Sequence, residues 1–322
     1  LAELNEFAAS ATRGSIDFAD LRGAYLAKLL SFVDVEKLQP LKIVCNAGNG
    51  GAGATVDLLE SLLPFELIRV HHEADGNFPN GVPNPMLEEN RAPTTAAILE
   101  HKADLGIAWD GDFDRCFFFD ENGRFIEGYY LVGLLAQVFL EAEPGAKIVH
   151  DPRLTWNTQE IVAAAGGTAI QSVTGHAYMK ESLREHLAVY GGEMSAHHYF
   201  RDFYYSDSGM VPWLLVTALM AATGKRLSQL VDERMQAFPA SGEINRTIAD
   251  PKALLAEARA RYETDAVVVE NVDGLSMSFD SWRFNLRLSN TEPVVRLNVE
   301  SRGNEALMRE KTAELLALMA QP

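Results

Sequence analysis

The sequence is poor in cysteine and has no long hydrophobic run, and both absences exclude whole classes of protein. Only Cys45 and Cys116 occur among the 322 residues, each inside an apolar segment, where a buried reduced thiol is the usual state. A disulfide-stapled scaffold is therefore excluded. The longest charge-free apolar segments, residues 129–140 and 211–222, are shorter than the stretch of about 20 residues that spans a bilayer as a helix. We expect two buried helices and no membrane partner.

Positive charge is also scarce in the sequence. Lys and Arg number 28 against 45 Asp and Glu, which gives a formal net charge of −17. A surface of this sign repels nucleic acid and anionic lipid headgroups, so neither is an expected partner, although a local group of Arg and His residues could still bind a small anion. No basic segment followed by an apolar one opens the chain, which favours a cytoplasmic location. Because Leu1 stands where Met would, we expect either a processed product or a chain that begins inside a longer gene.

The residues present are those of an ordinary folded protein with two or three domains, since 47% are hydrophobic and 23% charged. Apolar strands and helical periods alternate twice, from residue 41 and again from residue 129, which predicts two consecutive α/β domains with mixed or parallel sheets. Strands grouped around two helices near the end predict a smaller α+β C-terminal domain. We place the three domains at residues 1–127, 128–239 and 240–322.

The expected elements are read from the same patterns. Strands are expected at residues 41–45, 65–70, 103–109, 117–120, 125–126, 147–150, 168–172, 242–248, 266–270, 275–279, 282–288 and 294–300. Helices are expected within residues 15–30 and at 54–63, 94–102, 129–142, 157–165, 178–187, 211–222, 251–262 and 305–319. Residues 75–85, dense in Gly, Pro and Asn, predict a long ordered loop.

The strongest local signal is a run of three carboxylates after a buried strand. Asp110, Asp112 and Asp114 alternate within DGDFDR. Three carboxylates this close need a cation to share their charge, and hard oxygen ligands favour Mg²⁺. The alternative is a solvated acidic turn.

Two other motifs share part of this pattern. An EF-hand loop also begins D-x-D-x-D, and Glu121 falls at its twelfth position, but Arg115 stands where that loop needs Gly, and the flanks are strands. The EF-hand is therefore excluded. A phosphatase with an Asp nucleophile would carry Thr or Val where this chain carries Asp114, and it stays open as an alternative.

A glycine-rich turn follows the first strand of the chain. Gly48, Gly50 and Gly53 fit the G-x-G-x-x-G dinucleotide fingerprint, with Glu73 and Asp75 about 20 residues later. A lone match of this kind is weak evidence for a nucleotide. We favour the alternative that the glycines allow a tight turn and the close approach of another backbone.

Two later loops combine groups suited to a phosphosugar. The GGEMSAHH segment combines a carboxylate, a hydroxyl and two imidazoles, from Glu193, Ser195, His197 and His198. Of these, Glu193 and Ser195 suit the recognition of neighbouring sugar hydroxyls. Surface or capping roles are the alternative for the histidines. The RLSNTEPVVR segment offers the groups that a phosphate dianion needs, namely guanidinium groups, hydroxyls and N–H donors. The residues concerned are Arg287, Ser289, Asn290, Thr291 and Arg296. A polar hairpin turn is the alternative there. Residues that could flank a bound phosphate are Arg115, Arg153, His176 and Lys180.

Together these loops resemble those of the phosphomannomutase/phosphoglucomutase family of the α-D-phosphohexomutase superfamily, over essentially the whole chain. The resemblance implies that a DGDxDR loop holds Mg²⁺ through Asp110, Asp112 and Asp114. It implies that a GEMSGHH-type loop reads the sugar's 3- and 4-hydroxyls through Glu193, Ser195, His197 and His198. It implies an RxSNTEP loop that binds the substrate phosphate through Arg287, Ser289, Asn290, Thr291 and Arg296. Arg153 is a further expected substrate contact, and Arg115, Lys180 and His176 are the expected catalytic residues.

The implied reaction is the reversible conversion of mannose 1-phosphate and mannose 6-phosphate, and of glucose phosphates, through a hexose 1,6-bisphosphate that acts as activator and intermediate. The implied pathway is the supply of GDP-mannose for bacterial surface polysaccharide. The three predicted domains then correspond to the second, third and fourth domains of the family.

Three departures from the family pattern bear on activity. Ala196 replaces the usual Gly, and Val173 stands where many relatives carry Lys. No TASHNP-type loop, whose serine carries the phosphoryl group, occurs in these 322 residues. We therefore expect domains two to four, with the missing first domain as their natural partner, to bind phosphosugar and turn over poorly. A non-catalytic phosphosugar-binding module and a Mg²⁺-dependent sugar phosphatase are the alternatives.

Overall fold

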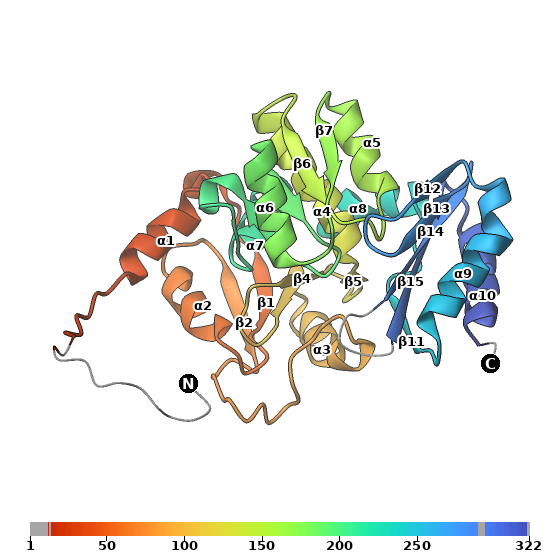
Figure 1. Ribbon diagram of the computed structural model, residues 1–322. Coiled ribbons are helices and arrows are strands. Elements are labelled where there is room, and N and C mark those ends of the chain that lie inside the picture. The colour runs from red at the N-terminus through yellow and green to blue at the C-terminus, as the bar shows by residue number, and fades with distance from the viewer. Residues whose placement is uncertain (1–11, 13, 289–293, 321–322) are drawn as a thin grey trace.

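The structure is a computed structural model that describes residues 12, 14–288 and 294–320 (Figure 1). The described residues form three five-stranded sheets, which follow one another along the chain. The first two sheets are mixed and carry helices, and the third is antiparallel. The predicted fold class is therefore confirmed.

The first sheet has the strand order β2-β1-β3-β4-β5, in which the first three strands are parallel. The carboxyl ends of β1 and β3 carry the glycine-rich turn and the acidic loop, so parallel pairing brings these two loops to the same edge of the sheet. Its strands are β1 (Lys42–Asn46), β2 (Glu66–Val70), β3 (Leu105–Trp109), β4 (Cys116–Phe119) and β5 (Phe125–Ile126), and its helices are α1 (Arg22–Leu30), α2 (Ala52–Glu60) and α3 (Ala92–His101).

The second sheet has the order β10-β9-β8-β6-β7, in which β7, β6 and β8 are parallel and β9 and β10 reverse direction. Its strands are β6 (Lys147–His150), β7 (Thr168–Gln171), β8 (Tyr190–Gly192), β9 (His198–Phe200) and β10 (Ser206–Asp207). Its helices are α4 (Gly128–Ala142), α5 (Trp156–Ala164), α6 (His176–His186), α7 (Val211–Thr223) and α8 (Leu227–Ala237). The short strands β8–β10 and helix α8 were not among the expected elements.

The third sheet has the order β11-β15-β14-β13-β12, and helices α9 and α10 cover one of its faces (Figure 1). Its strands are β11 (Ile244–Thr247), β12 (Val268–Glu270), β13 (Leu275–Ser278), β14 (Trp282–Leu288) and β15 (Val294–Ser301), and its helices are α9 (Pro251–Tyr262) and α10 (Glu305–Met319). Short 3₁₀ turns occur at Val35–Lys37, Glu88–Asn90, Arg201–Phe203 and Glu263–Asp265.

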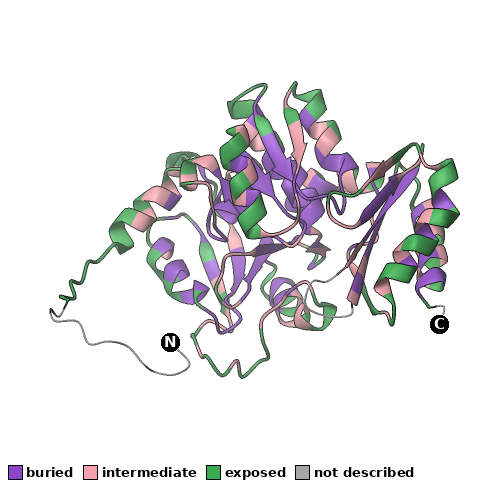
Figure 2. Ribbon diagram, in the orientation of Figure 1, coloured by how far each residue is buried: buried purple, intermediate pink, exposed green. Residues whose placement is uncertain are grey.

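The apolar core is continuous across the first two sheets and separate in the third. One cluster of buried side chains extends from Leu29 to Phe238, and a second lies between the third sheet and its helices. Figure 2 shows buried strands in all three sheets, with the exposed residues concentrated on helices and loops. Within the described residues, no helix combines the length and the apolar character needed to cross a membrane.

Candidate active site

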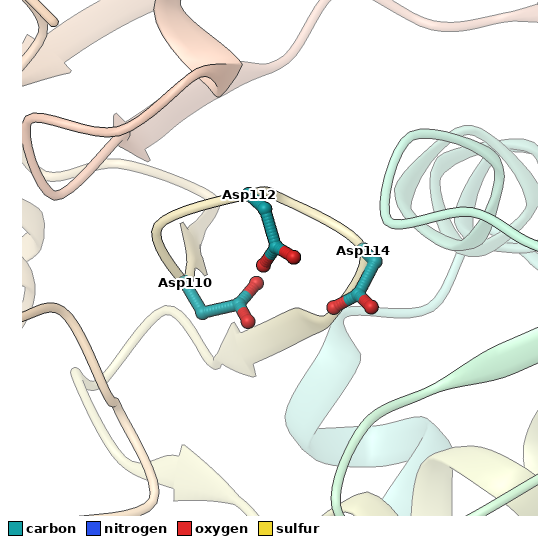
Figure 3. Close-up of side chains that lie close together, drawn as sticks. All are labelled: Asp110, Asp112 and Asp114. Carbon is teal, nitrogen blue, oxygen red and sulfur yellow. The ribbon is translucent and has the colours of Figure 1, made fainter. Parts of the chain in front are cut away.

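The three carboxylates of the acidic loop converge between β3 and β4. One carboxylate oxygen of each residue lies within 4.8 Å of the corresponding oxygens of the other two, and Figure 3 shows the side chains of Asp110, Asp112 and Asp114 pointing into the loop. Asp110 is buried, Asp114 is half-buried and Asp112 is exposed. The three carboxylates are therefore buried at Asp110 and accessible to solvent at Asp112.

Arg115 holds the buried end of this carboxylate group. Its Nε and backbone N–H donate to the carboxylate of Asp110 at 2.7 and 3.2 Å. Burial raises the pKa of Asp110 despite this guanidinium, and the charge of Asp114 adds to the effect. The pKa of Asp114 is lowered by its contact with His197, whose Nε2 lies 3.5 Å from the carboxylate. Such crowding of negative charge favours a bound cation.

Two glycines let neighbouring backbone approach the acidic loop. A Cβ added at Gly50 would lie 2.4 Å from the carbonyl oxygen of Gly111, and one at Gly209 would lie 2.4 Å from that of Phe113. No larger residue fits at either contact without displacing the loop. The glycine-rich turn thus supports the acidic loop, as the favoured interpretation of its glycines predicts.

The sugar loop (residues 191–198) lies directly beside the acidic loop (residues 110–115). The backbone N–H of Cys116 donates to the carbonyl of Ala196 at 3.2 Å. In the loop, Glu193 is 1% exposed and accepts from the Tyr199 hydroxyl at 2.6 Å and from the Gly175 N–H at 2.9 Å. These bonds fix the carboxylate while the half-buried Ser195 and His197 lie next to it. Tyr199 is a positioning residue that sequence reasoning missed.

His197 and His198 lie in opposite environments. His197 has a raised pKa, because the carboxylates of Asp114 and Glu193 outweigh the opposing effect of burial. His198 is fully buried, its Nδ1 lies 2.7 Å from the Tyr190 hydroxyl, and burial lowers its pKa to about 3. His198 therefore packs against Tyr190 inside the protein, and its contact with sugar hydroxyls stays a prediction.

Arg153 lies beside the sugar loop in a buried charge cluster. Its guanidinium donates to Asp151 at 2.8 Å, to Glu243 at 3.0 Å and to the Ser195 hydroxyl at 3.3 Å. Only 1% of Arg153 is exposed. With these partners Arg153 holds the sugar loop in place, and its contact with substrate stays a prediction. Asp151 and Glu243 were not anticipated, although Asp151 follows the buried strand β6 directly.

Arg287 and Arg296 are cross-strand neighbours on β14 and β15. Like charges placed directly opposite repel each other. Among the described residues, Arg287 lies 2.8 Å from Asp273 and Arg296 lies 3.8 Å from Glu243. The pair is thus a cationic position suited to an anion. Ser289, Asn290 and Thr291 lie outside the described residues.

The loop at Thr174 and Gly175 links this cationic pair to the sugar loop. Its Thr174 N–H donates at 3.2 Å to Asp273, the partner of Arg287, and its Gly175 N–H donates to Glu193. Of the predicted catalytic residues in α6, His176 is exposed at the start of the helix, and Lys180 pairs with Asp207 at 2.9 Å. The sugar loop and the Arg287–Arg296 pair are therefore connected through hydrogen bonds to the side chains of Glu193 and Asp273.

Three family models match consecutive parts of the chain, and their order is decisive. Their descriptions are phosphoglucomutase/phosphomannomutase alpha/beta/alpha domain II for residues 23–123, domain III for residues 127–238 and C-terminal domain for residues 243–317. The chain belongs to the phosphoglucomutase/phosphomannomutase family.

Relatives of this phosphohexomutase chain match along nearly its whole length. A phosphomannomutase of Salmonella montevideo is 58% identical over 326 residues, which cover 99% of this chain and 72% of that protein. A protein of Xanthomonas campestris pv. campestris named phosphohexose mutases is 61% identical over 296 residues, 92% of this chain and 66% of that protein. A crystal structure of a phosphoglucomutase/phosphomannomutase family protein from Burkholderia thailandensis is 30% identical, with a TM-score of 0.81 over 93% of this chain and 64% of that one.

The acidic loop of this family member fits the cation that the family implies. Mg²⁺ prefers oxygen ligands and binds through a few carboxylates plus substrate phosphate. Asp110, Asp112 and Asp114 supply only carboxylate oxygens, and their convergence leaves the side of Asp112 accessible. The residues present therefore suit Mg²⁺.

Proposed function

We propose that this chain supplies the cation site and the phosphosugar-binding surfaces of a phosphomannomutase/phosphoglucomutase. The reaction moves a phosphoryl group between the 1- and 6-oxygens of a mannose or glucose phosphate, through a hexose 1,6-bisphosphate that turns over in the site. The observation that carries the proposal is the contact of the acidic loop with the sugar loop and the link from the sugar loop to the Arg287–Arg296 pair. Relatives named phosphomannomutase at 56–58% identity over 99% of the chain support it.

Each loop has a distinct task in this proposal. Asp110, Asp112 and Asp114 would hold Mg²⁺, which when bound neutralises charge on the transferring phosphoryl group. Glu193, already fixed by Tyr199 and Gly175, presents its carboxylate to two neighbouring sugar hydroxyls. The Arg287 and Arg296 pair holds the phosphate that is not reacting.

The nucleophile is not evident among these 322 residues. Phosphoryl transfer needs an acceptor placed in line with the bound phosphate, and no TASHNP-type serine loop occurs in the printed sequence. We propose that these residues alone bind phosphosugar but turn over poorly. Supplying the phosphoserine domain of a phosphomannomutase should restore turnover, which separates this proposal from a binding module without catalytic function.

The phosphate assignment is tested by the Arg287→Ala variant. Loss of a charge-assisted, partly buried contact should weaken mannose 1-phosphate binding by about 10-fold or more. Isothermal titration in the presence of Mg²⁺ measures the affinity. Arg309→Ala is the matched control, since Arg309 carries the same charge on exposed α10 and pairs only with Glu305 among the described residues. Equal affinity in the Arg287→Ala variant and the unsubstituted chain would rule out this phosphate site.

A further inference from the structure

The loop at residues 71–85 packs against the acidic loop, and the proposed reaction makes no use of it. Its Phe78 ring covers Gly111, since a Cβ added at Gly111 would lie 3.3 Å from the Phe78 Cζ atom. Its Pro83 covers Gly48 in the same way, at 2.3 Å. This loop, which we name the brace loop, therefore lies against the acidic loop and the glycine-rich turn together.

Asn49 is the point at which the brace loop joins the glycine-rich turn. Its backbone N–H donates to the His71 carbonyl at 2.7 Å, and its carbonyl accepts from the Asp75 N–H at 2.9 Å. Its side-chain amide donates to the Glu73 carbonyl and accepts from the Asn80 amide, both at 2.8 Å. Asn49 is only 8% exposed. All four contacts connect one buried residue to the brace loop.

The same turn holds the acidic loop through its backbone. The Gly51 N–H, two residues after Asn49, donates to the Gly111 carbonyl at 3.0 Å. Gly111 lies between Asp110 and Asp112, so the position of this carbonyl affects the separation of their carboxylates. A displacement of Asn49 is therefore transmitted to two of the three converging side chains.

Backbone strain is concentrated in this assembly. Positive φ angles occur at Asn49 (57°), His71 (43°), Phe78 (47°) and Phe113 (51°). Asn tolerates this conformation, whereas a bulky residue such as Phe adopts it only rarely. Strained residues persist only where their surroundings over-determine them, and they cluster at functional sites. The hydrogen bonds of Asn49 provide such a constraint.

We infer that Asn49 is a positioning residue for the divalent cation: by joining the brace loop to the glycine-rich turn, it holds Gly111 so that the carboxylates of Asp110 and Asp112 stay converged. This inference rests on the proposed cation role of the acidic loop. Its chemistry requires no contact between Asn49 and the ion, because the effect passes through Gly51 and Gly111.

The test is a titration of the 322-residue chain with Mn²⁺, in which electron paramagnetic resonance measures the free ion. Asn49→Gly keeps the positive φ accessible and removes both side-chain bonds. We expect the affinity of the Asn49→Gly variant for Mn²⁺ to fall about 3- to 10-fold. This loss does not exceed the one that follows removal of a residue bonded directly to a metal ligand. Asn80→Ala, which removes one of the same bonds from an exposed residue, should reduce the affinity in the same direction.

Lys102→Gly is the control, since Lys102 ends α3 with a φ of 51° and has no contact with the acidic loop among the described hydrogen bonds and ion pairs. Circular dichroism establishes whether each variant is folded. If Asn49→Gly is not folded, the Mn²⁺ affinity of Asn80→Ala alone tests the inference. Mn²⁺ affinities within twofold of the unsubstituted chain in both variants would overturn the inference alone. Failure of the unsubstituted chain to bind Mn²⁺ would instead overturn the cation site, and the inference with it.

Discussion

Single residues in the sugar loop show how strand alternation separates neighbours that look equivalent in the sequence. Successive side chains of a strand point to opposite faces. His197 and Tyr199 therefore both approach Glu193, whereas His198 between them packs with Tyr190 in the core. Adjacent histidines in a polar motif gave no reason to assign them different roles. Recognition of a strand at His198–Phe200 would have predicted both the buried His198 and the positioning role of Tyr199.

The buried His198 predicts a specific dependence of stability on pH. Its pKa is about 3 in the folded chain against an ordinary value of 6.5, so the unfolded chain takes up the proton first as the pH falls. The contribution of neutral His198 to stability is complete above about pH 6.5 and is lost progressively toward pH 3. Between pH 7 and pH 4.5, the loss is about 2–3 kcal/mol.

Urea denaturation at these two pH values checks this expectation. The decrease in the free energy of unfolding between pH 7 and pH 4.5 should be smaller by that amount in His198→Phe than in the unsubstituted chain. His101→Phe, which removes an exposed histidine from the end of α3, should leave the decrease unchanged. An equal pH dependence in His198→Phe and the unsubstituted chain would show that His198 is not held neutral by burial.

Among the secondary-structure elements, β14 and β15 have two chemically different faces. One face packs Phe284 and Leu286 into the C-terminal core. The other is a ladder of polar cross-strand pairs, in which Arg283 faces Glu300, Asn285 faces Asn298 and Arg287 faces Arg296. The ladder begins at a buried interface with the second sheet and ends at the proposed phosphate site. The polar face of one sheet thus serves both domain attachment and anion binding.

The interface end of this ladder predicts a large stability effect. Glu300 accepts from Arg283 at 2.9 Å, from the Thr155 N–H at 2.7 Å and from the Tyr129 hydroxyl, and it is fully buried. Glu300→Gln leaves the Arg283 guanidinium buried without its counter-charge, so the free energy of unfolding should fall by roughly 3–5 kcal/mol.

Urea denaturation of the variant, followed by tryptophan fluorescence, measures this loss. Glu305→Gln is the matched control, because Glu305 pairs with Arg309 on the exposed surface of α10, and surface pairs contribute about 1 kcal/mol or less. A Glu300→Gln variant as stable as this control would contradict the account of the interface.

Local sequence patterns were sufficient to predict most helices and strands but missed a few. The buried helix Val211–Thr223 stands out as a charge-free apolar run and the strand Trp282–Leu288 as an alternation, and the sequence predicted both. The strand Tyr190–Gly192 is three residues long and includes two glycines, so it shows neither alternation nor β-branched residues. Helix Leu227–Ala237 follows α7 after a short connection and buries few apolar side chains, so no apolar run marks it in the sequence.

At the scale of the whole molecule, the site depends on how three units meet. The first two sheets share one apolar core, whereas the third attaches through buried polar groups around Arg153, Arg283 and Glu300. Loop motifs predicted which chemistries are present, but the burial of Arg153 and its pairing with Glu243 arise only from the contact between two domains. Such contacts involve residues 90 positions apart, and no local pattern encodes them.

The central claim is that the three loops bind a phosphosugar as one site, and phosphorus NMR tests it most directly. The sample contains this chain, Mg²⁺, mannose 1-phosphate and a catalytic amount of hexose 1,6-bisphosphate. We predict that the mannose 1-phosphate resonance shifts or broadens without product, and that mannose 6-phosphate accumulates once a phosphoserine domain is supplied. An unchanged resonance, or the release of inorganic phosphate, would contradict the account.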